Sequence, residues 1–198
     1  MKLISLIFVF ASLALAQGTL PEAPVPQTAP VNTEAKAAVV SARLPLPQNI
    51  SDSIPWFAVF ELRNDNAPFT RNHLERTCRN SNNVAFVYFA TWCLPCREGL
   101  KKISQNMAAL QEAKTSIVLV NVGEREKDKI VEFLKMFSLE NTLTVVDPFS
   151  RLTEGFGLIK PNEKIDLPRT IMFDNSMHAK LIVGMEGDDY MEILKGNW

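Results

Sequence analysis

The spacing of hydrophobic residues changes along the chain, and this change predicts strands that alternate with helices. Two stretches, 84–90 and 116–122, are almost continuously apolar and rich in β-branched and aromatic residues, which is typical of strands covered on both faces of a sheet. In 94–112 and 128–137, apolar residues instead recur every three or four positions, as on one face of a helix. These four segments predict a buried sheet with helices packed against it.

Shorter patterns extend this order in both directions. The further expected strands are 57–62, 68–70, 143–146, 170–174 and 179–184. The further helices are one that is capped by Thr70 or Asn72 and runs to about residue 79, and two over 150–156 and 188–194. Strands and helices that alternate and then end in a hairpin and a helix predict an α/β fold, with a central mixed sheet flanked by helices on both faces. The first two strands form an N-terminal strand or hairpin extension to it.

The first sixteen residues have the three parts of a secretory signal peptide. A positive start with Lys2 precedes the apolar run 3–13, and Ala14-Leu15-Ala16 is a small-x-small cleavage pattern. The apolar run is shorter than the roughly 20 residues that a transmembrane helix needs. We therefore expect export and cleavage after residue 16, and the alternative is an uncleaved segment that anchors the chain in a membrane.

Residues 17–48 differ in composition from the rest of the chain. Six prolines lie here among alanine, valine, threonine and glutamate, with no period of 2 or 3.6. Such a stretch is typical of an extended, largely disordered tether. The sequence thus predicts three parts: a signal peptide over 1–16, a tether over 17–48 and one folded domain over 49–198.

Charge and composition exclude several classes of protein. The net charge is −1 with both signs interspersed, and no basic run or patch suggests a nucleic-acid partner. Three cysteines in 198 residues are too few for a disulfide-stapled miniprotein, and 46% hydrophobic residues are ample for a core. We expect a folded, monomeric protein.

The segment that joins the strand 84–90 to the helix after it contains the candidate chemistry. Cys93 and Cys96 are separated by two residues, which is typical of a redox-active pair after a strand. At the start of a helix, Cys93 would meet unpaired N–H groups that favour the thiolate, while Cys96 would lie one turn further along. Pro95 suits a first helical turn. We expect Cys93 to be the nucleophile and Cys96 the resolving thiol.

Metal binding is the alternative use of such a pair. A structural zinc site needs four ligands, and the remaining candidates, His73, Cys78 and His178, do not lie at ligand spacing. We therefore expect no metal and no other cofactor. The two histidines are interpreted as surface residues, and Cys78 as a buried, inert thiol that shares a helix face with Leu74. The alternative for this unpaired cysteine is a reactive thiol or a disulfide to another molecule.

Two motifs and the strand order together resemble the thioredoxin-like superfamily, in particular its secreted TlpA/ResA-like thiol–disulfide oxidoreductases. The motifs are Phe-Ala-Thr-Trp-Cys-Leu-Pro-Cys-Arg-Glu at 89–98 and Leu-Pro-Arg-Thr-Ile-Met-Phe-Asp at 167–174. The resemblance implies a cis proline at Pro168 beside the cysteines and a backbone contact from Leu167 to the substrate. We expect the substrate-binding residues to be Trp92, Leu94, Pro95, Leu167 and Pro168, although Trp92 could equally be a packing residue.

Three positions depart from the family pattern. The buried acid that thioredoxins carry six residues before the first cysteine is Val87 here. Glu61 is a candidate replacement, but it could equally be an exposed strand residue. A kinking proline is replaced by Lys101, although Gly99 nearby could ease a bend. Residues 161–165 form an apparently extra loop before Pro168, which could shape partner choice.

These features predict a thiol–disulfide oxidoreductase that works outside the cytoplasm, in the periplasm. The expected reaction is reduction of disulfides in exported proteins, with apocytochrome c thiols among the substrates that the resemblance allows. A reductant in an oxidising compartment would need a membrane partner as electron donor. The alternatives are a disulfide oxidase or isomerase, and a non-catalytic thioredoxin-fold protein that binds copper.

Overall fold

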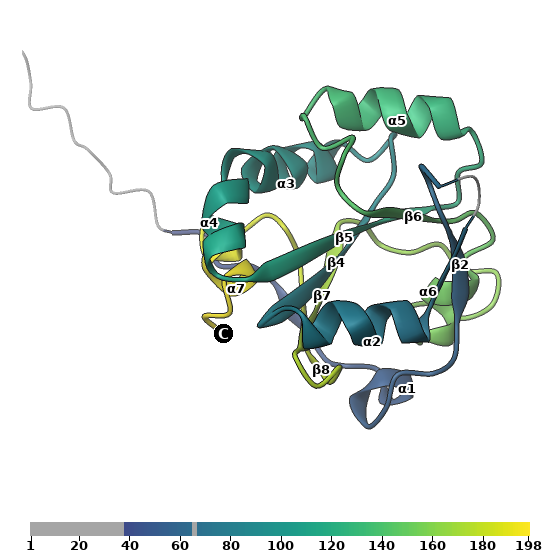
Figure 1. The fold of residues 1–198 in the computed structure, drawn as a ribbon, viewed down its shortest axis with the longest axis horizontal. Helices are drawn as coiled ribbons and strands as arrows, with labels where there is room; N and C mark the ends of the chain where they lie inside the picture. Colours follow the sequence, from purple (N-terminus) through teal and green to yellow (C-terminus); the bar gives the residue numbers. More distant parts are fainter. Residues whose placement is uncertain (1–37, 65–66) are drawn as a thin grey trace, which may run out of the picture. The chain divides into compact units, whose positions relative to one another are not determined.

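The computed structural model describes residues 38–64 and 67–198 of the chain (Figure 1). The predicted signal peptide and the first part of the predicted tether lie outside these residues. The described part contains one mixed sheet of eight strands in the order β1-β8-β7-β4-β5-β6-β2-β3. The strands are β1 (Arg43–Leu44), β2 (Ala58–Glu61), β3 (Pro68–Thr70), β4 (Asn83–Phe89), β5 (Thr115–Val122), β6 (Thr144–Asp147), β7 (Arg169–Asp174) and β8 (Ala179–Val183).

Strand β4 lies in the interior of the sheet, as its continuous apolar sequence predicts. It pairs in parallel with β5 and antiparallel with β7, and β5 pairs in parallel with β6. Successive β4 side chains point to opposite faces, so Ala85, Val87 and Phe89 join one core cluster while Val84 and Phe86 join the other. A strand buried on both faces has no polar positions, which explains the unbroken apolar run.

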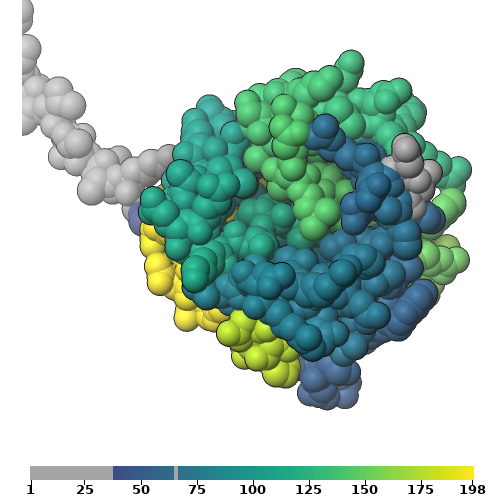
Figure 2. Space-filling view, in the orientation of Figure 1, coloured from purple at the N-terminus to yellow at the C-terminus, as the bar shows by residue number. Residues whose placement is uncertain are grey.

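Helices cover both faces of the sheet (Figure 1). Their bounds are α1 (Gln48–Ser51), α2 (Arg71–Arg79), α3 (Leu94–Gln105), α4 (Met107–Glu112), α5 (Lys127–Lys135), α6 (Arg151–Gly155) and α7 (Tyr190–Leu194). Buried residues of α3, α4, α5 and α7 share one core cluster, and those of α1, α2 and α6 share the other. Helix α2 extends across the near side of the molecule in Figure 2. Across the described ranges, no helix has the length and apolarity to cross a bilayer.

The single helix predicted over 94–112 is two helices, α3 and α4. The break is at Asn106, whose side chain donates to the Lys102 carbonyl oxygen at 2.8 Å. Its backbone N–H donates to the carbonyl oxygen of Ile103, three residues earlier, whereas in an α-helix the acceptor lies four residues earlier. The apolar period continues through the break, so periodicity alone predicted one helix.

Residues 38–48, assigned to the tether by composition, are part of the folded unit. Strand β1 pairs antiparallel with β8 through Arg43 and Val183. Carboxylates of the β8–α7 loop accept backbone N–H groups of this segment: Asp188 accepts from Val39, Asp189 from Ser41 and Glu186 from Ala42. These partners lie more than 140 residues away, so no local pattern indicates the pairing.

Candidate active site

The topology gathers the candidate chemistry at one edge of the sheet. Parallel strands β4, β5 and β6 all end at this edge, and antiparallel β7 begins there. Cys93 follows β4, Glu124 follows β5, Phe149 follows β6 and Pro168 precedes β7. In open α/β sheets, ligand sites form at the carboxyl ends of the strands.

Cys93 and Cys96 form a disulfide with their Cα atoms 5.4 Å apart. Cys93 is the residue that caps the N-terminus of α3, and its Sγ accepts the Cys96 backbone N–H at 3.2 Å. The turn before it is closed by the Cys93 N–H, which donates to the Ala90 carbonyl oxygen at 3.1 Å. Cys93 is 4% exposed and Cys96 is fully buried, so the thiol that a partner can reach is Cys93.

Large apolar side chains surround Cys93 at the surface. Trp92 is 63% exposed and Leu94 is 70% exposed, and Pro95 is exposed beside them. The exposure of Trp92 removes the alternative that it is a core packing residue. Phe149, which the sequence interpretation had missed, is also exposed. The Arg125 guanidinium lies over the Phe149 ring, with its Cζ atom 4.6 Å from the ring centroid.

The Leu167–Pro168 peptide bond is cis, as the family resemblance implies. Pro168 is buried, and Leu167 packs against the core cluster that contains Cys93 and Cys96. The Arg169 guanidinium donates to the Pro168 carbonyl oxygen at 3.0 Å and forms an ion pair with Asp166. The structure therefore brings the two predicted motifs together.

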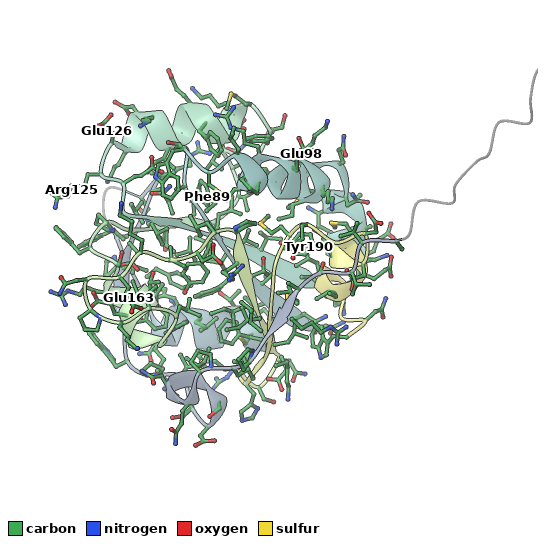
Figure 3. All side chains as sticks on the ribbon, turned by 180° about the vertical axis from the view of Figure 1, so that it is seen from behind. Phe89, Glu98, Arg125, Glu126, Glu163 and Tyr190 are labelled. Carbon is green, nitrogen blue, oxygen red and sulfur yellow. A yellow bond between two sulfur atoms is a disulfide. The ribbon has the colours of Figure 1, made fainter. Side chains whose placement is uncertain are left out.

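Two cavities flank Trp92. One, of about 430 Å³, is bounded by the predicted extra loop through Glu163, Lys164 and Ile165. The other cavity, of about 510 Å³, is lined by residues 123–126 and Lys129 in addition to Trp92. Figure 3 shows Arg125 and Glu163, one from each wall, on the same side of the molecule. The extra loop thus lies beside the site.

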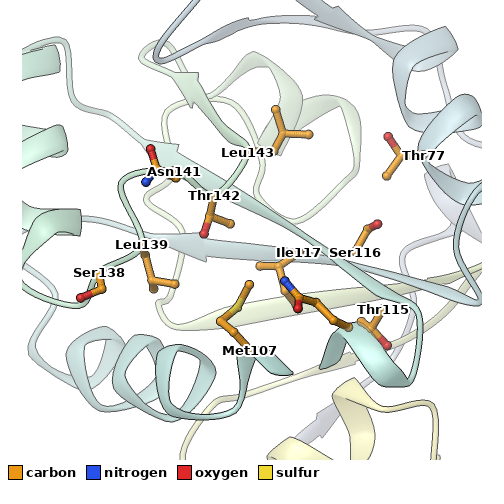
Figure 4. A pocket seen from close by; sticks show the side chains of 11 residues that line it. Thr77, Met107, Thr115, Ser116, Ile117, Ser138, Leu139, Asn141, Thr142 and Leu143 are labelled. Carbon is orange, nitrogen blue, oxygen red and sulfur yellow. The ribbon is translucent and has the colours of Figure 1, made fainter. Parts of the chain in front are cut away.

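A third cavity, of about 420 Å³, lies at the opposite edge of the sheet, where β5 begins. Hydroxyl and amide side chains, among them Ser116 and Asn141, make up much of its wall (Figure 4). None of the residues that line it is a cysteine, histidine or charged residue. Neither Cys93 nor Cys96 lines it.

No carboxylate occupies the place of the thioredoxin acid. Val87 lies beside Leu119 of β5 and Thr170 of β7. The Thr170 hydroxyl pairs with the buried Tyr190 hydroxyl at 2.8 Å, and burial raises the pKa of Tyr190. The prediction that Glu61 replaces this acid is wrong. Glu61 lies on β2, and strands β5 and β6 lie between β2 and β4 in the sheet.

Gly99 has a packing function in α3. A Cβ atom at this position would lie 2.1 Å from the Met185 Cε atom and 2.7 Å from its Cβ. Helix α3 does not end at Gly99 and continues to Gln105. The glycine therefore lets the β8–α7 loop approach α3 one turn after Cys96.

The remaining candidate residues lie away from the site. Cys78 is fully buried in α2, and burial, followed by the Asp174 charge, raises the pKa of its thiol to about 12. His73 Nδ1 accepts the Thr70 N–H at the start of α2, and His178 lies 3.5 Å from the Asp174 carboxylate. Within residues 38–64 and 67–198, no three histidine, cysteine or acidic side chains are grouped to hold a metal ion.

Sequence reasoning missed one polar group at this edge. The Glu124 carboxylate accepts hydrogen bonds from the backbone and hydroxyl of Thr91 and from the Asn121 side chain. The available signal was Asn121, a polar residue inside the otherwise apolar stretch 117–122. A buried amide requires a hydrogen-bond partner, and here that partner is Glu124.

Comparison with known proteins agrees with this arrangement. Residues 51–181 match the AhpC/TSA family. Curated proteins include no match to this sequence.

Solved structures share the fold at low identity. A secreted thiol–disulfide isomerase from Corynebacterium glutamicum is 18% identical with a TM-score of 0.57, over 82% of this chain and 90% of that one. A secreted Mycobacterium tuberculosis disulfide oxidoreductase, described as homologous to Escherichia coli DsbE, is 15% identical with a TM-score of 0.53, over 71% and 92%. A thioredoxin family thiol:disulfide interchange protein from Chlorobium tepidum is 19% identical with a TM-score of 0.54, over 82% and 97%.

The family match covers most of the folded domain and includes both cysteines and Pro168. The eight-stranded mixed sheet of the described residues agrees with the thioredoxin-like fold of these structures. The chain therefore belongs to the AhpC/TSA family and is a thioredoxin-like thiol–disulfide oxidoreductase, in which Cys93 and Cys96 form a disulfide at the start of α3.

Proposed function

We propose that this protein reduces disulfide bonds in exported proteins outside the cytoplasm. The observation that carries the proposal is the placement of Cys93 at the N-terminus of α3, where its Sγ accepts a hydrogen bond from the Cys96 backbone N–H. The exposed side chains of Trp92 and Leu94 lie on either side of it in the sequence. N–H groups and the helix dipole favour a thiolate there. The apolar side chains offer a contact surface to a polypeptide substrate.

The reaction follows from the order of the two thiols. In the reduced protein, the Cys93 thiolate attacks one sulfur of a substrate disulfide and forms a mixed disulfide, releasing the other substrate sulfur as a thiolate. Cys96, after losing its proton, attacks Cys93 and releases the second substrate thiol. Two electrons pass to the substrate, and the protein is left with the Cys93–Cys96 disulfide. A thiol donor must then reduce this disulfide before the next cycle.

Substrate contacts in this proposal come from both motifs. Trp92, Leu94 and Pro95 would line one side of the bound chain, and Leu167 with Pro168 the other. The predicted signal peptide supports export, and two of the structural relatives are described as secreted. Periplasmic location, a membrane electron donor, a monomeric state and a substrate such as apocytochrome c are parts of the same proposal.

The deciding experiment is a titration of the Cys93–Cys96 couple against glutathione. We expect a reduction potential more negative than the glutathione pool, which lies at about −220 to −260 mV. The reduced protein should also reduce a test disulfide such as insulin. A potential near that of the strong oxidant DsbA, about −120 mV, would contradict the reductase and favour an oxidase or isomerase. Copper retained through purification, with no disulfide exchange, would favour a binding protein.

A further inference from the structure

The end of β5 places a carboxylate against the turn that carries the nucleophile. Glu124 follows β5 by two residues, and its side chain is only 10% exposed. Thr91 lies within the turn that the Cys93 N–H closes onto Ala90. The two residues are 33 positions apart in the sequence, and the parallel pairing of β4 with β5 brings them together.

Both oxygens of this carboxylate accept hydrogen bonds. Oε2 accepts the Thr91 backbone N–H at 2.8 Å and the Asn121 Nδ2 at 2.7 Å. Oε1 accepts the Thr91 hydroxyl at 2.5 Å and lies 3.8 Å from the Lys129 ammonium. A carboxylate held by a backbone donor and a side-chain donor of the same residue fixes both the position and the orientation of that residue.

This hold matters most when the protein is reduced. In the oxidised state, the disulfide itself restrains Cys93 relative to α3. When the disulfide opens, that covalent restraint is gone, and the turn from Ala90 to Cys93 keeps its place through noncovalent contacts. Nucleophilic attack is sensitive to such placement, since a 1 Å displacement can cost about a hundredfold in rate.

We propose that Glu124 is a positioning residue for thiol–disulfide exchange, which holds the Thr91 turn so that the reduced Cys93 sulfur stays at the N-terminus of α3. The inference rests on the proposed function, because it concerns the reactive state of the same centre. Glu124 acts through Thr91, and its charge is not itself part of the reaction.

A glutamine at this position separates hydrogen bonding from charge. In Glu124→Gln the amide oxygen can take the place of Oε2 and accept from Thr91 N–H and Asn121. The amide NH2 then takes the place of Oε1 and donates to the Thr91 hydroxyl, which can accept as well as donate. The three contacts are kept while the negative charge is removed. Glu124→Ala removes all three.

The experiment measures the rate at which iodoacetamide alkylates Cys93 in the reduced protein, as a function of pH, beside insulin reduction. We expect Glu124→Ala to lower the alkylation rate and kcat/KM by about tenfold or more, and to shift the alkylation profile to higher pH. Glu124→Gln should stay within about threefold of the unchanged protein, because the contacts persist. Glu132→Ala, at an exposed acid of the helix α5 that follows this loop, is the matched control and should have no effect.

Three results would overturn the proposal. They are a Glu124→Ala variant within twofold of the unchanged protein, a Glu124→Gln variant as slow as Glu124→Ala, and a rate loss that only follows a loss of folded protein in thermal unfolding. Failure of the proposed function is a different result: alkylation would still depend on Glu124, but the unchanged protein would not reduce any disulfide.

Discussion

Two cysteine sites in this molecule show how little exposure alone says about a thiol. Cys93 is 4% exposed and Cys78 is 0% exposed, so both are buried by the same measure. They lie at opposite kinds of helix end: Cys93 caps the N-terminus of α3, and Cys78 lies in the last turn of α2. The N-terminal end of a helix favours an anion and the C-terminal end disfavours one.

The surroundings of the two sulfurs strengthen this difference. The Cys93 Sγ accepts a backbone N–H, while the thiol of Cys78 has its pKa raised to about 12 by burial and by the Asp174 charge. Exposed Trp92 and Leu94 flank the first site, whereas Cys78 belongs to the buried core cluster that contains Leu74. Reactivity is therefore decided by the electrostatics of the site and by access for a partner.

The largest expected effect comes from exchanging sulfur for oxygen at each site. Cys93→Ser should reduce insulin no faster than the uncatalysed reaction, because the attacking thiolate is gone. Cys78→Ser should keep the activity of the unchanged protein, and the turbidity of precipitating insulin measures both. Comparable losses in the two variants would mean that Cys78 takes part in exchange.

A second test compares the thiols directly by alkylation. At pH 8 a thiol of pKa about 12 is ionised on the order of a thousandfold less than a free thiol of pKa about 8.5. Cys78 should thus remain unlabelled in the native reduced protein and become labelled in urea, as mass spectrometry of the peptides would show. Rapid native labelling would contradict the environment described for α2.

The same raised pKa has a consequence for stability. The folded protein holds the Cys78 proton more tightly than the unfolded chain does, so this contribution is complete below the unfolded pKa. It is lost as pH rises toward about 12. Cys78→Ser should therefore weaken the alkaline decline in the free energy of unfolding, measured by urea titration between pH 8 and pH 10.

The smallest expected effect concerns the packing of α3 against the loop that follows β8. Gly99→Val places methyl groups where Met185 packs, and overpacking of this kind costs about 1–3 kcal/mol of unfolding free energy. Met185→Ala in the same chain should restore part of the loss by making room. Thermal unfolding of the two variants measures this. Gly99→Val as stable as the unchanged protein would show that the loop after β8 can shift without cost.

Local sequence signals determined most of the elements and the chemical centre. The apolar runs 84–90 and 116–122 predicted β4 and β5, and the cysteine spacing with Pro95 predicted the start of α3. Such signals are local: a strand buried on both faces needs consecutive apolar residues, and a dithiol at a helix start needs its cysteines one turn apart. The resemblance of two motifs, not the pattern alone, led to the cis bond at Pro168.

Tertiary structure decided what depends on residues far apart in the chain. The pairing of β1 with β8, the hold of Glu124 on Thr91 and the contact of Gly99 with Met185 each join segments that share no local pattern. The order of strands in the sheet likewise places Glu61 away from the cysteines. Local patterns predict where the strands are, but they do not predict which strands are neighbours in the sheet. The sequence by itself therefore predicted the cysteine pair and the start of its helix, and the folded chain decided which distant residues contact the turn that precedes Cys93.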